Sequence, residues 1–186
     1  MRNIIKKEIE SHIDIINSVS DHIDEIINVT EVIISSLEKG NTIYLCGNGG
    51  SAGDSQHIAA ELTGRFKSER DGLPAIALTT DTSAITAIAN DYSFDDIFSR
   101  QFKALAKKGD VLVTISTSGN SKNLLKAVEV AKKNECKSIG LIGKDGGLLK
   151  QQCNYSVHIR SNDTARIQEA HIMVGHIICG IIDRKF

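Results

Sequence analysis

The chain has 186 residues, of which 41 % are hydrophobic and 24 % are charged, and its formal net charge at pH 7 is −1. These values are normal for a soluble globular protein of one domain, or of one domain with an extension. A net charge near zero argues against bulk binding to nucleic acid or to an anionic membrane. The apolar run at 175–182 is far shorter than the roughly 20 residues that a membrane-spanning helix needs, so we expect no membrane partner.

Residues 2–38 predict a helical segment. Isoleucines recur at helical spacing from Ile4 to Ile33, proline is absent, and Gly40 supplies a stop. The pattern fits one long helix, or two helices with a break near 18–21. So many isoleucines on a terminal helix exceed the needs of one small core, which favours packing against another subunit. Packing within the chain is the simpler alternative.

From Thr42 onward, short apolar runs alternate with helical segments. The predicted strands are 42–46, 75–78, 111–115, 138–142 and 156–159. The predicted helices are 52–66, 83–90, 94–107, 121–134, 147–152 and 164–184. Continuous apolar runs are typical of strands buried on both faces, and strand–helix repetition predicts a parallel sheet. The expected fold class is α/β: a three-layer, doubly wound, five-stranded parallel sheet with an N-terminal helical extension.

Polar loops follow the first three predicted strands, and the third of them carries four hydroxyls around a glycine, at Ser116, Thr117, Ser118 and Ser121. Ligands of such sheets bind beyond the carboxyl ends of the strands. A helix follows this loop directly, and the free N–H groups at its start favour phosphate. A simple helix cap would need only one such side chain, and no GxxxxGK[ST] motif supports a nucleotide site. We therefore expect this loop to bind a phosphate group.

His57 and Glu61 lie four residues apart on the predicted helix after the first strand, and Asp54 shares their stripe. Such a pair suits a divalent cation such as zinc, and it suits proton transfer equally well. A surface ion pair is the plainer alternative. We expect four other histidines to be structural or solvent-facing: His12, His22, His158 and His171.

The cysteines, Cys46, Cys136, Cys153 and Cys179, are widely spaced and form no CxxC pair. Because no secretory signal is seen at the start of the chain, we expect reduced thiols and a cytoplasmic protein. Cys46 and Cys179 are expected to fill core space.

Four separated stretches carry a resemblance to a known family. They read CGNGGSA with DSQHIAAELTGR, LTTDTSA with ANDY, ISTSGNS, and DTARIQEAHIMVGHIICGIID. Together they resemble the phosphoheptose isomerases, the sedoheptulose 7-phosphate isomerases of the sugar-isomerase (SIS) fold. The match runs essentially end to end, whereas ISTSGNS alone would mark only the wider SIS group. The resemblance implies one SIS domain over 1–186, with 1–40 as a helical segment for oligomer packing and 41–186 as the α/β core.

The resemblance also implies roles for individual residues. The acid/base pair of the family falls on Glu61 and His176. Zinc, one ion per subunit, would be held by His57, Glu61, Gln168 and His176. The substrate-binding positions would be Asn48, Gly49, Gly50, Ser51, Glu61, Arg65, Asn90, Asp91, Ser116, Thr117, Ser118, Ser121 and Gln168.

Helix geometry limits how the two residues of the last helix can meet. Gln168 and His176 are eight residues apart, so their Cα atoms lie about 12 Å apart along the axis and are turned by about 80°. Their extended side chains can just converge on one ion, or the two contributions come from different subunits. Either arrangement is compatible with an active site at a subunit interface, and the resemblance implies a homotetramer.

By resemblance, the reaction converts sedoheptulose 7-phosphate to D-glycero-D-manno-heptose 7-phosphate through an enediol. This is the first step of heptose precursor biosynthesis for lipopolysaccharide or capsule. We expect Glu61 to move the carbon-bound proton and His176 the oxygen-bound one, with exchanged roles as the alternative. Two other functions stay open: a non-catalytic sugar-phosphate sensor or adaptor, and an isomerase of another phosphosugar. The presence of Glu61, Gln168 and His176 favours an enzyme over an adaptor.

Overall fold

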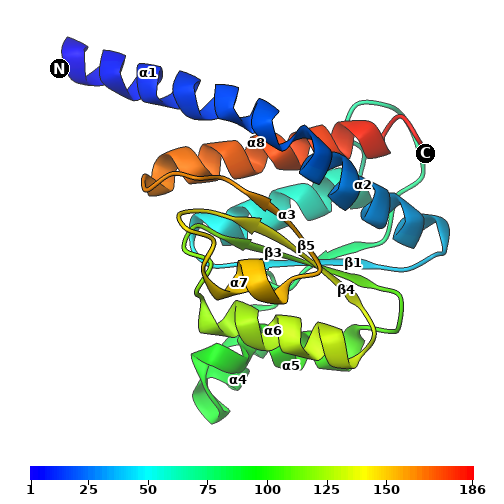
Figure 1. Ribbon diagram of the computed structural model, residues 1–186. Helices are drawn as coiled ribbons and strands as arrows, with labels where there is room; N and C mark the ends of the chain where they lie inside the picture. The colour runs from blue at the N-terminus through cyan, green and yellow to red at the C-terminus, as the bar shows by residue number, and fades with distance from the viewer.

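The apolar runs of the sequence form five strands that lie side by side in one sheet (Figure 1). They are β1 Ile43–Gly47, β2 Ala75–Ala77, β3 Val111–Ser116, β4 Lys137–Ile142 and β5 Tyr155–His158. The computed structural model describes all residues, Met1–Phe186. Every pairing is parallel, in the order β2-β1-β3-β4-β5. The predicted class, an α/β fold with a five-stranded parallel sheet, is confirmed.

The helices are α1 Arg2–Ser18, η1 Val19–His22, α2 Ile23–Glu38, α3 Gly50–Thr63, α4 Thr82–Asp91, η2 Phe94–Asp96, α5 Ile97–Leu105, α6 Lys122–Lys133, α7 Gly147–Gln152 and α8 Thr164–Ile182. Two helices depart most from prediction: the segment expected over 94–107 divides into η2 and α5, and the helix expected over 52–66 is α3. It begins two residues early, directly after Gly49, and includes two glycines that helix propensity disfavours. None of the helices has both the length and the apolar character needed to cross a bilayer.

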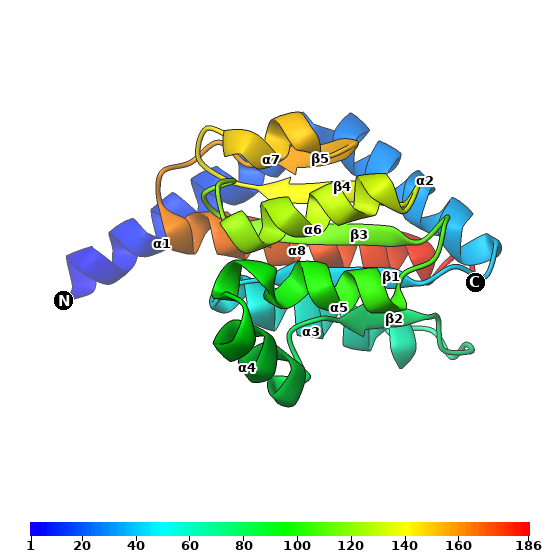
Figure 2. The same ribbon diagram turned by 90° about the horizontal axis from the view of Figure 1, so that it is seen from below.

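Helices cover both faces of the sheet, as the three-layer prediction requires (Figures 1 and 2). Alternate strand residues point to opposite faces. Ile43 and Leu45 enter the larger core, which α2, α3 and α8 complete. Tyr44 and Cys46 enter the smaller core, which α5, α6 and α7 complete. Because helices cover both faces, the sheet is open to a ligand only at the ends of its strands, where polar loops emerge.

Cys46 and Cys179 are buried and free, which confirms that they fill core space. Burial raises the pKa of the Cys46 thiol well above its usual range. Burial, with a contribution from Glu61, raises the pKa of Cys179 to about 12. Both therefore stay protonated thiols at neutral pH.

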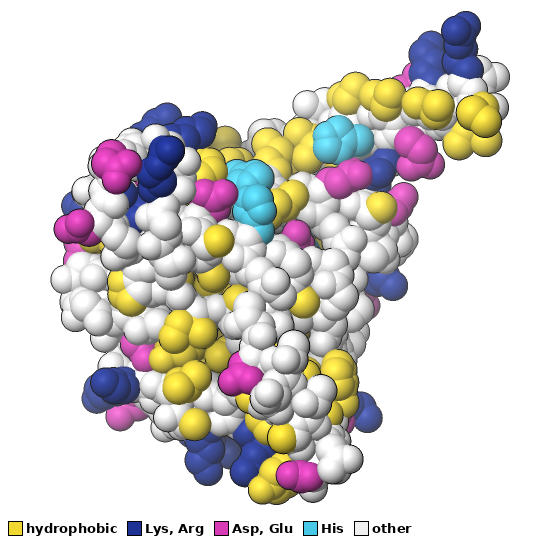
Figure 3. All heavy atoms as spheres, turned by 180° about the vertical axis from the view of Figure 1, so that it is seen from behind, with side chains coloured by type: hydrophobic (Ala, Val, Ile, Leu, Met, Phe, Trp, Pro, Cys, Tyr) yellow, Lys and Arg dark blue, Asp and Glu magenta, His cyan; other side chains and the backbone are white.

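The N-terminal helices are separated by the 3-10 turn η1, so the two-helix alternative is correct. Helix α1 projects from the body of the molecule, and Ile15 is its only buried residue (Figure 1). Arg166 of α8 holds it by a 3.1 Å ion pair with Glu8. Hydrophobic side chains line the projecting arm in Figure 3, and Ile4 is 65 % exposed. This apolar face is not covered within one chain.

His171 is an unusual member of the core. It lies on the buried side of α8 with 1 % of its surface exposed, and neither ring nitrogen has a hydrogen-bond partner. Burial lowers the pKa of this imidazole to about 4. The ring is therefore neutral in the folded protein at pH 7, and its protonation opposes folding.

We expect mild acid to destabilise the fold through His171. The unfolded chain takes up this proton below about pH 6.5, whereas the folded chain does so only near pH 4. The free energy of unfolding is therefore highest above pH 6.5 and decreases by about 2 kcal/mol between pH 6.5 and 5. Urea unfolding at pH 7, 6 and 5 measures the free energy, with His171→Leu as the non-titrating variant. Equal pH slopes in the two proteins would contradict the prediction.

Candidate active site

The loops after β1 and β3 meet where the strand order reverses. β2 lies on one side of β1 and β3 on the other, so the chain leaves the two loops in opposite directions and a crevice opens at the carboxyl ends of these strands. Asn48, after β1, and Asn123, in the first turn of α6, bridge this crevice. Their side-chain amides exchange two hydrogen bonds of 3.0 and 2.8 Å. The two loops predicted to bind substrate are thereby held together.

Helix α3 begins at this crevice without a side-chain cap. Its N-cap residue, Gly49, has a φ of +56°, a conformation that favours glycine. The amide of Gln168, reaching across from α8, lies against Gly50, and a Cβ at residue 50 would collide with it. An uncapped helix start with an amide beside it favours an anionic or strongly polar ligand.

The hydroxyl loop, residues 116–121, is shaped by its own serines. Ser116 Oγ accepts a hydrogen bond from the Gly119 N–H at 3.0 Å and lies 3.4 Å from Ser121 Oγ. Gly119 has a φ of +67°, which a side chain would strain. Ser121 is the N-cap residue of α6, yet its hydroxyl makes no cap hydrogen bond. The first N–H groups of α6 are therefore without a side-chain cap, as a phosphate site requires.

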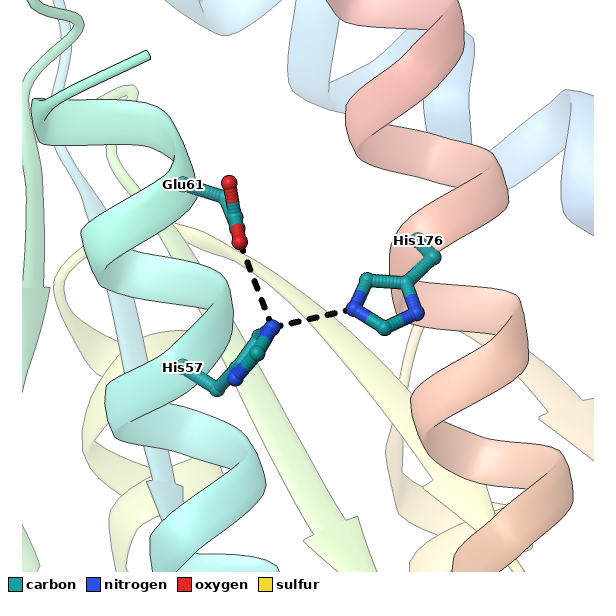
Figure 4. Close-up of side chains that lie close together, drawn as sticks. All are labelled: His57, Glu61 and His176. Atoms are coloured by element: carbon teal, nitrogen blue, oxygen red, sulfur yellow. Dashed lines mark hydrogen bonds and ion pairs between the residues drawn. The ribbon is translucent and has the colours of Figure 1, made fainter. Parts of the chain in front are cut away.

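A second cluster lies between α3 and α8 (Figure 4). His57 and Glu61 project from α3 toward His176 on α8. His57 Nε2 lies 3.2 Å from Glu61 Oε1 and 2.9 Å from His176 Nε2. One donor atom from each residue fits within 4.8 Å of the others. The side chains of His57 and Glu61 are 48 % and 23 % exposed, so this His57–Glu61–His176 cluster can be reached from solvent.

Two contacts hold His176 in this position. The preceding residue is Gly175, where a Cβ would lie 2.6 Å from Ile58 Cδ1 on α3. The missing side chain lets the two helices approach closely. Phe66, in the loop after α3, stacks on the His176 ring with centroids 5.9 Å apart and planes 25° apart. This stacking limits how the His176 ring can turn.

The donor set of the cluster fits a divalent cation. Imidazole nitrogens and carboxylate oxygens bind zinc at about 2.0–2.2 Å, so a tetrahedral ion separates two of them by about 3.3 Å. The observed separations of 2.9 and 3.2 Å are close to this value. Three protein ligands would leave a fourth position open, which is typical of catalytic zinc sites.

The structure brings three of the four predicted metal ligands together and leaves the fourth apart. Gln168 lies beside Gly50, about 10 Å along α3 from His57. Arg65, expected near the substrate, turns toward Glu69 at 3.6 Å and is mostly exposed.

Asn90 and Asp91 lie at the end of α4, where the Asn90 amide donates to Asp91 at 2.9 Å. Helix α4 lies on the opposite side of the sheet from α3 and α8 (Figure 1). One chain therefore does not gather this pair and the His57–Glu61–His176 cluster into one centre.

Two residues at the site were not predicted from the sequence. Asn123 lies in a helix whose first turn reads as ordinary surface, and only the fold shows it facing Asn48. Only one feature of the sequence points to Phe66, which is a lone aromatic residue in the polar stretch after Gly64. Neither position can be paired with its partner from sequence spacing alone.

The other histidines lie outside the cluster. His158 Nε2 lies 2.9 Å from the Lys144 carbonyl oxygen, and burial lowers the pKa of His158. His12 pairs with Glu169 at 2.8 Å, which joins α1 to α8. These contacts fit the expected structural roles.

The fold and the hydroxyl loop define the class of protein. Residues 9–143 match the family described as SIS domain. This range covers most of the chain, including the first four strands, the hydroxyl loop and the residues His57 and Glu61. The chain is therefore an SIS-domain protein.

Individual proteins of high sequence identity identify the branch of the SIS-domain proteins to which the chain belongs. The chain is 53 % identical to the phosphoheptose isomerase of Aliarcobacter butzleri, over 100 % of this chain and 98 % of that protein. It is 55 % identical to the phosphoheptose isomerase of a Nitratiruptor species, over 98 % of both. The solved structure of phosphoheptose isomerase GmhA from Neisseria gonorrhoeae superposes with a TM-score of 0.93 at 41 % identity, covering 98 % of each chain. A phosphoheptose isomerase from Francisella tularensis gives a TM-score of 0.94 at 39 % identity, covering 98 % of this chain and 97 % of that one. The chain belongs to the phosphoheptose isomerase family.

Two alanine substitutions on α3 separate site geometry from helix stability. Gly53 has open space around its Cα, so Gly53→Ala should stabilise the protein by up to about 1 kcal/mol and leave isomerase activity unchanged. Gly50→Ala should displace the Gln168 amide and lower kcat/KM by about tenfold or more, because small misplacements at a site are costly. Thermal unfolding and steady-state kinetics test both. Equal activities in the two variants would contradict a role for the Gly50–Gln168 contact.

Proposed function

We propose that the chain interconverts sedoheptulose 7-phosphate and D-glycero-D-manno-heptose 7-phosphate, with the His57–Glu61–His176 cluster as its catalytic centre. The observation that carries the proposal is the meeting of one carboxylate and two imidazoles from α3 and α8. These groups lie on an SIS scaffold whose hydroxyl loop suits a phosphate. The name shared by the relatives, phosphoheptose isomerase, supports the same reaction.

The hydroxyl loop is proposed to bind the phosphate. Ser116, Thr117, Ser118 and Ser121 offer uncharged donors, and the start of α6 adds N–H groups with the positive end of the helix dipole. Binding energy gained at the phosphate then positions the reacting carbons at the far end of the sugar. The loop 48–51 and Gln168 would contact the sugar between these two ends. Arg65, Asn90 and Asp91 would complete the site at a subunit interface.

The reaction moves one hydrogen from C1 to C2 of the sugar. Glu61 removes a proton from C1, the C–H electron pair forms the C1–C2 double bond of a cis-enediol, and O2 receives a proton from His176. Glu61 then returns its proton to C2 while His176 takes the O1 proton, which leaves an aldehyde at C1. An imidazole can donate and accept within one cycle near neutral pH, and a positioned carboxylate is a suitable carbon base.

Zinc is the cofactor that we propose for this centre. His57, Glu61 and His176 would hold it, whereas Gln168, the fourth predicted ligand, lies beside Gly50 in this chain. When bound, the ion would polarise the sugar carbonyl and stabilise negative charge on the enediolate. Chelation followed by readdition of zinc tests whether activity depends on it.

The active unit is proposed to be a homotetramer with active sites at its interfaces. The support is the exposed apolar face of α1, together with a groove along α1, α2 and α8 that includes Ile16, Ile23, Met173 and Ile177. Residues 1–40 would serve this packing, and 41–186 would form the core of a single SIS domain. The enzyme would act in the cytoplasm and supply heptose for lipopolysaccharide or capsule.

Hydrogen exchange with solvent tests the reaction directly. Purified protein incubated with sedoheptulose 7-phosphate in D₂O should place deuterium on the sugar, as read by NMR. Absence of exchange, with or without added zinc, would contradict catalysis and favour a sugar-phosphate adaptor. Other ketose phosphates assayed beside it test the substrate, and faster turnover of a hexulose phosphate would contradict the heptose assignment.

Glu61→Gln should lower kcat by roughly 10²- to 10⁴-fold, because the amide cannot accept the carbon-bound proton. Binding of sedoheptulose 7-phosphate, measured by calorimetry, should persist. Glu69→Gln is the matched control, since Glu69 lies eight residues away and is 90 % exposed. Near-normal turnover of Glu61→Gln would remove Glu61 from catalysis.

Ser118→Ala should raise KM by about fivefold with little change in kcat, because one hydrogen bond to the phosphate is lost. Ser35→Ala on α2 is a control serine away from the hydroxyl loop. Steady-state kinetics with sedoheptulose 7-phosphate measure both variants. An unchanged KM in Ser118→Ala would count against this loop as the phosphate site.

A further inference from the structure

A buried ion pair joins the C-terminal ends of the two helices that carry the cluster. Arg70, in the loop after α3, pairs with Asp183 at the end of α8, with Nε and Oδ1 3.3 Å apart. Both side chains are 3 % exposed. Arg70 also caps α3, since Nη2 donates to the Glu61 carbonyl at 2.8 Å and Nη1 donates to the Leu62 carbonyl at 3.0 Å. The Glu61 carbonyl is one that a helix end otherwise leaves unpaired, whereas the Leu62 carbonyl also accepts the Leu73 N–H at 2.9 Å.

Asp183 binds the other side of the same loop. Its Oδ2 accepts the N–H groups of Lys67 at 3.2 Å and Ser68 at 2.8 Å. The Ser68 N–H, with help from the Lys67 N–H and the Arg70 guanidinium, holds the pKa of this carboxyl below its usual range. The anchored residues directly follow Phe66, whose ring stacks on His176. One carboxylate therefore anchors the end of α8 and the segment that orients His176.

Stability alone is a weak reason for such a pair. Burying two charges is costly, and apolar residues of similar volume are often as stabilising. A carboxylate at a helix C-terminus is also disfavoured by the helix dipole. The pair does supply directional bonds that an apolar contact lacks, and one of them ends on the backbone of Glu61.

We propose that Arg70 and Asp183 are a positioning pair that sets the spacing of α3 and α8 at the catalytic centre. This inference rests on the proposed function of the His57–Glu61–His176 cluster. The contact between Gly175 and Ile58 limits how closely the helices approach. The ion pair fixes the ends of both helices and the Phe66 loop, so the two constraints together define the distance from Glu61 to His176. Neither residue of the pair touches the substrate.

Three variants test the pair. Asp183→Asn keeps the shape and an acceptor for the loop N–H groups but removes the charge, and Arg70→Lys keeps the charge but cannot reach every carbonyl. The double variant Arg70→Met/Asp183→Leu replaces both charged groups by apolar ones. It therefore removes the pair without leaving one buried charge unpaired. Lys185→Met is the control, because it removes an exposed 3.0 Å pair with Glu38 near the same helix end. Thermal unfolding identifies the folded variants.

In the folded variants we expect kcat to fall and the Kd for Zn²⁺, measured by calorimetry, to rise, each by roughly 10- to 100-fold. KM should stay within about twofold, because the hydroxyl loop follows β3 and is untouched. The control should match the wild-type protein in all three quantities. A purely structural pair predicts that the double variant, once folded, has wild-type kcat and zinc affinity, and this result would overturn the proposal. If the wild-type protein does not turn over the sugar, the proposed function fails, while the zinc affinities still decide the positioning role.

Discussion

The candidate active site depends on how closely α3 and α8 pack. The two helices lie about a hundred residues apart in the sequence, and each carries part of one chemical centre. Glycine at 175 removes the side chain that would otherwise meet Ile58, so His176 can come within 2.9 Å of His57. Side chains of ordinary size at this crossing would separate the helices, and no rearrangement of the imidazoles alone would restore the cluster. Packing in the core thus sets the chemistry at the surface.

The anchoring of the sugar follows a different physical rule. The proposed phosphate site contains no lysine or arginine among its loop residues, and it relies on hydroxyls and on the starts of α3 and α6. Neither helix has a side-chain cap, although Ser121 stands at the N-cap position of α6. An uncharged site of this kind binds phosphate through oriented dipoles, which cost little reorganisation when the ligand arrives. The two hydrogen bonds between the amides of Asn48 and Asn123 hold the loop after β1 against the start of α6.

Much of the fold could be predicted from the sequence, because buried parallel strands leave continuous apolar runs and helices leave a periodic pattern. The same is true of the hydroxyl loop and of His57 with Glu61, which lie in one local segment. Long-range contacts left no such pattern. The sequence could not show that Gln168 rests on Gly50, that Phe66 stacks on His176, or that Arg70 donates to the Glu61 carbonyl at the end of α3. Each of these depends on which helices become neighbours, and that follows from the strand order.

The most direct test is a crystal structure of the protein with sedoheptulose 7-phosphate bound, with anomalous data collected at the zinc edge. We expect the phosphate at residues 116–121, the C1–C2 end of the sugar beside Glu61 and His176, and an anomalous peak among His57, Glu61 and His176. A sugar seated away from Glu61 and His176, with its phosphate elsewhere, would contradict the proposed site.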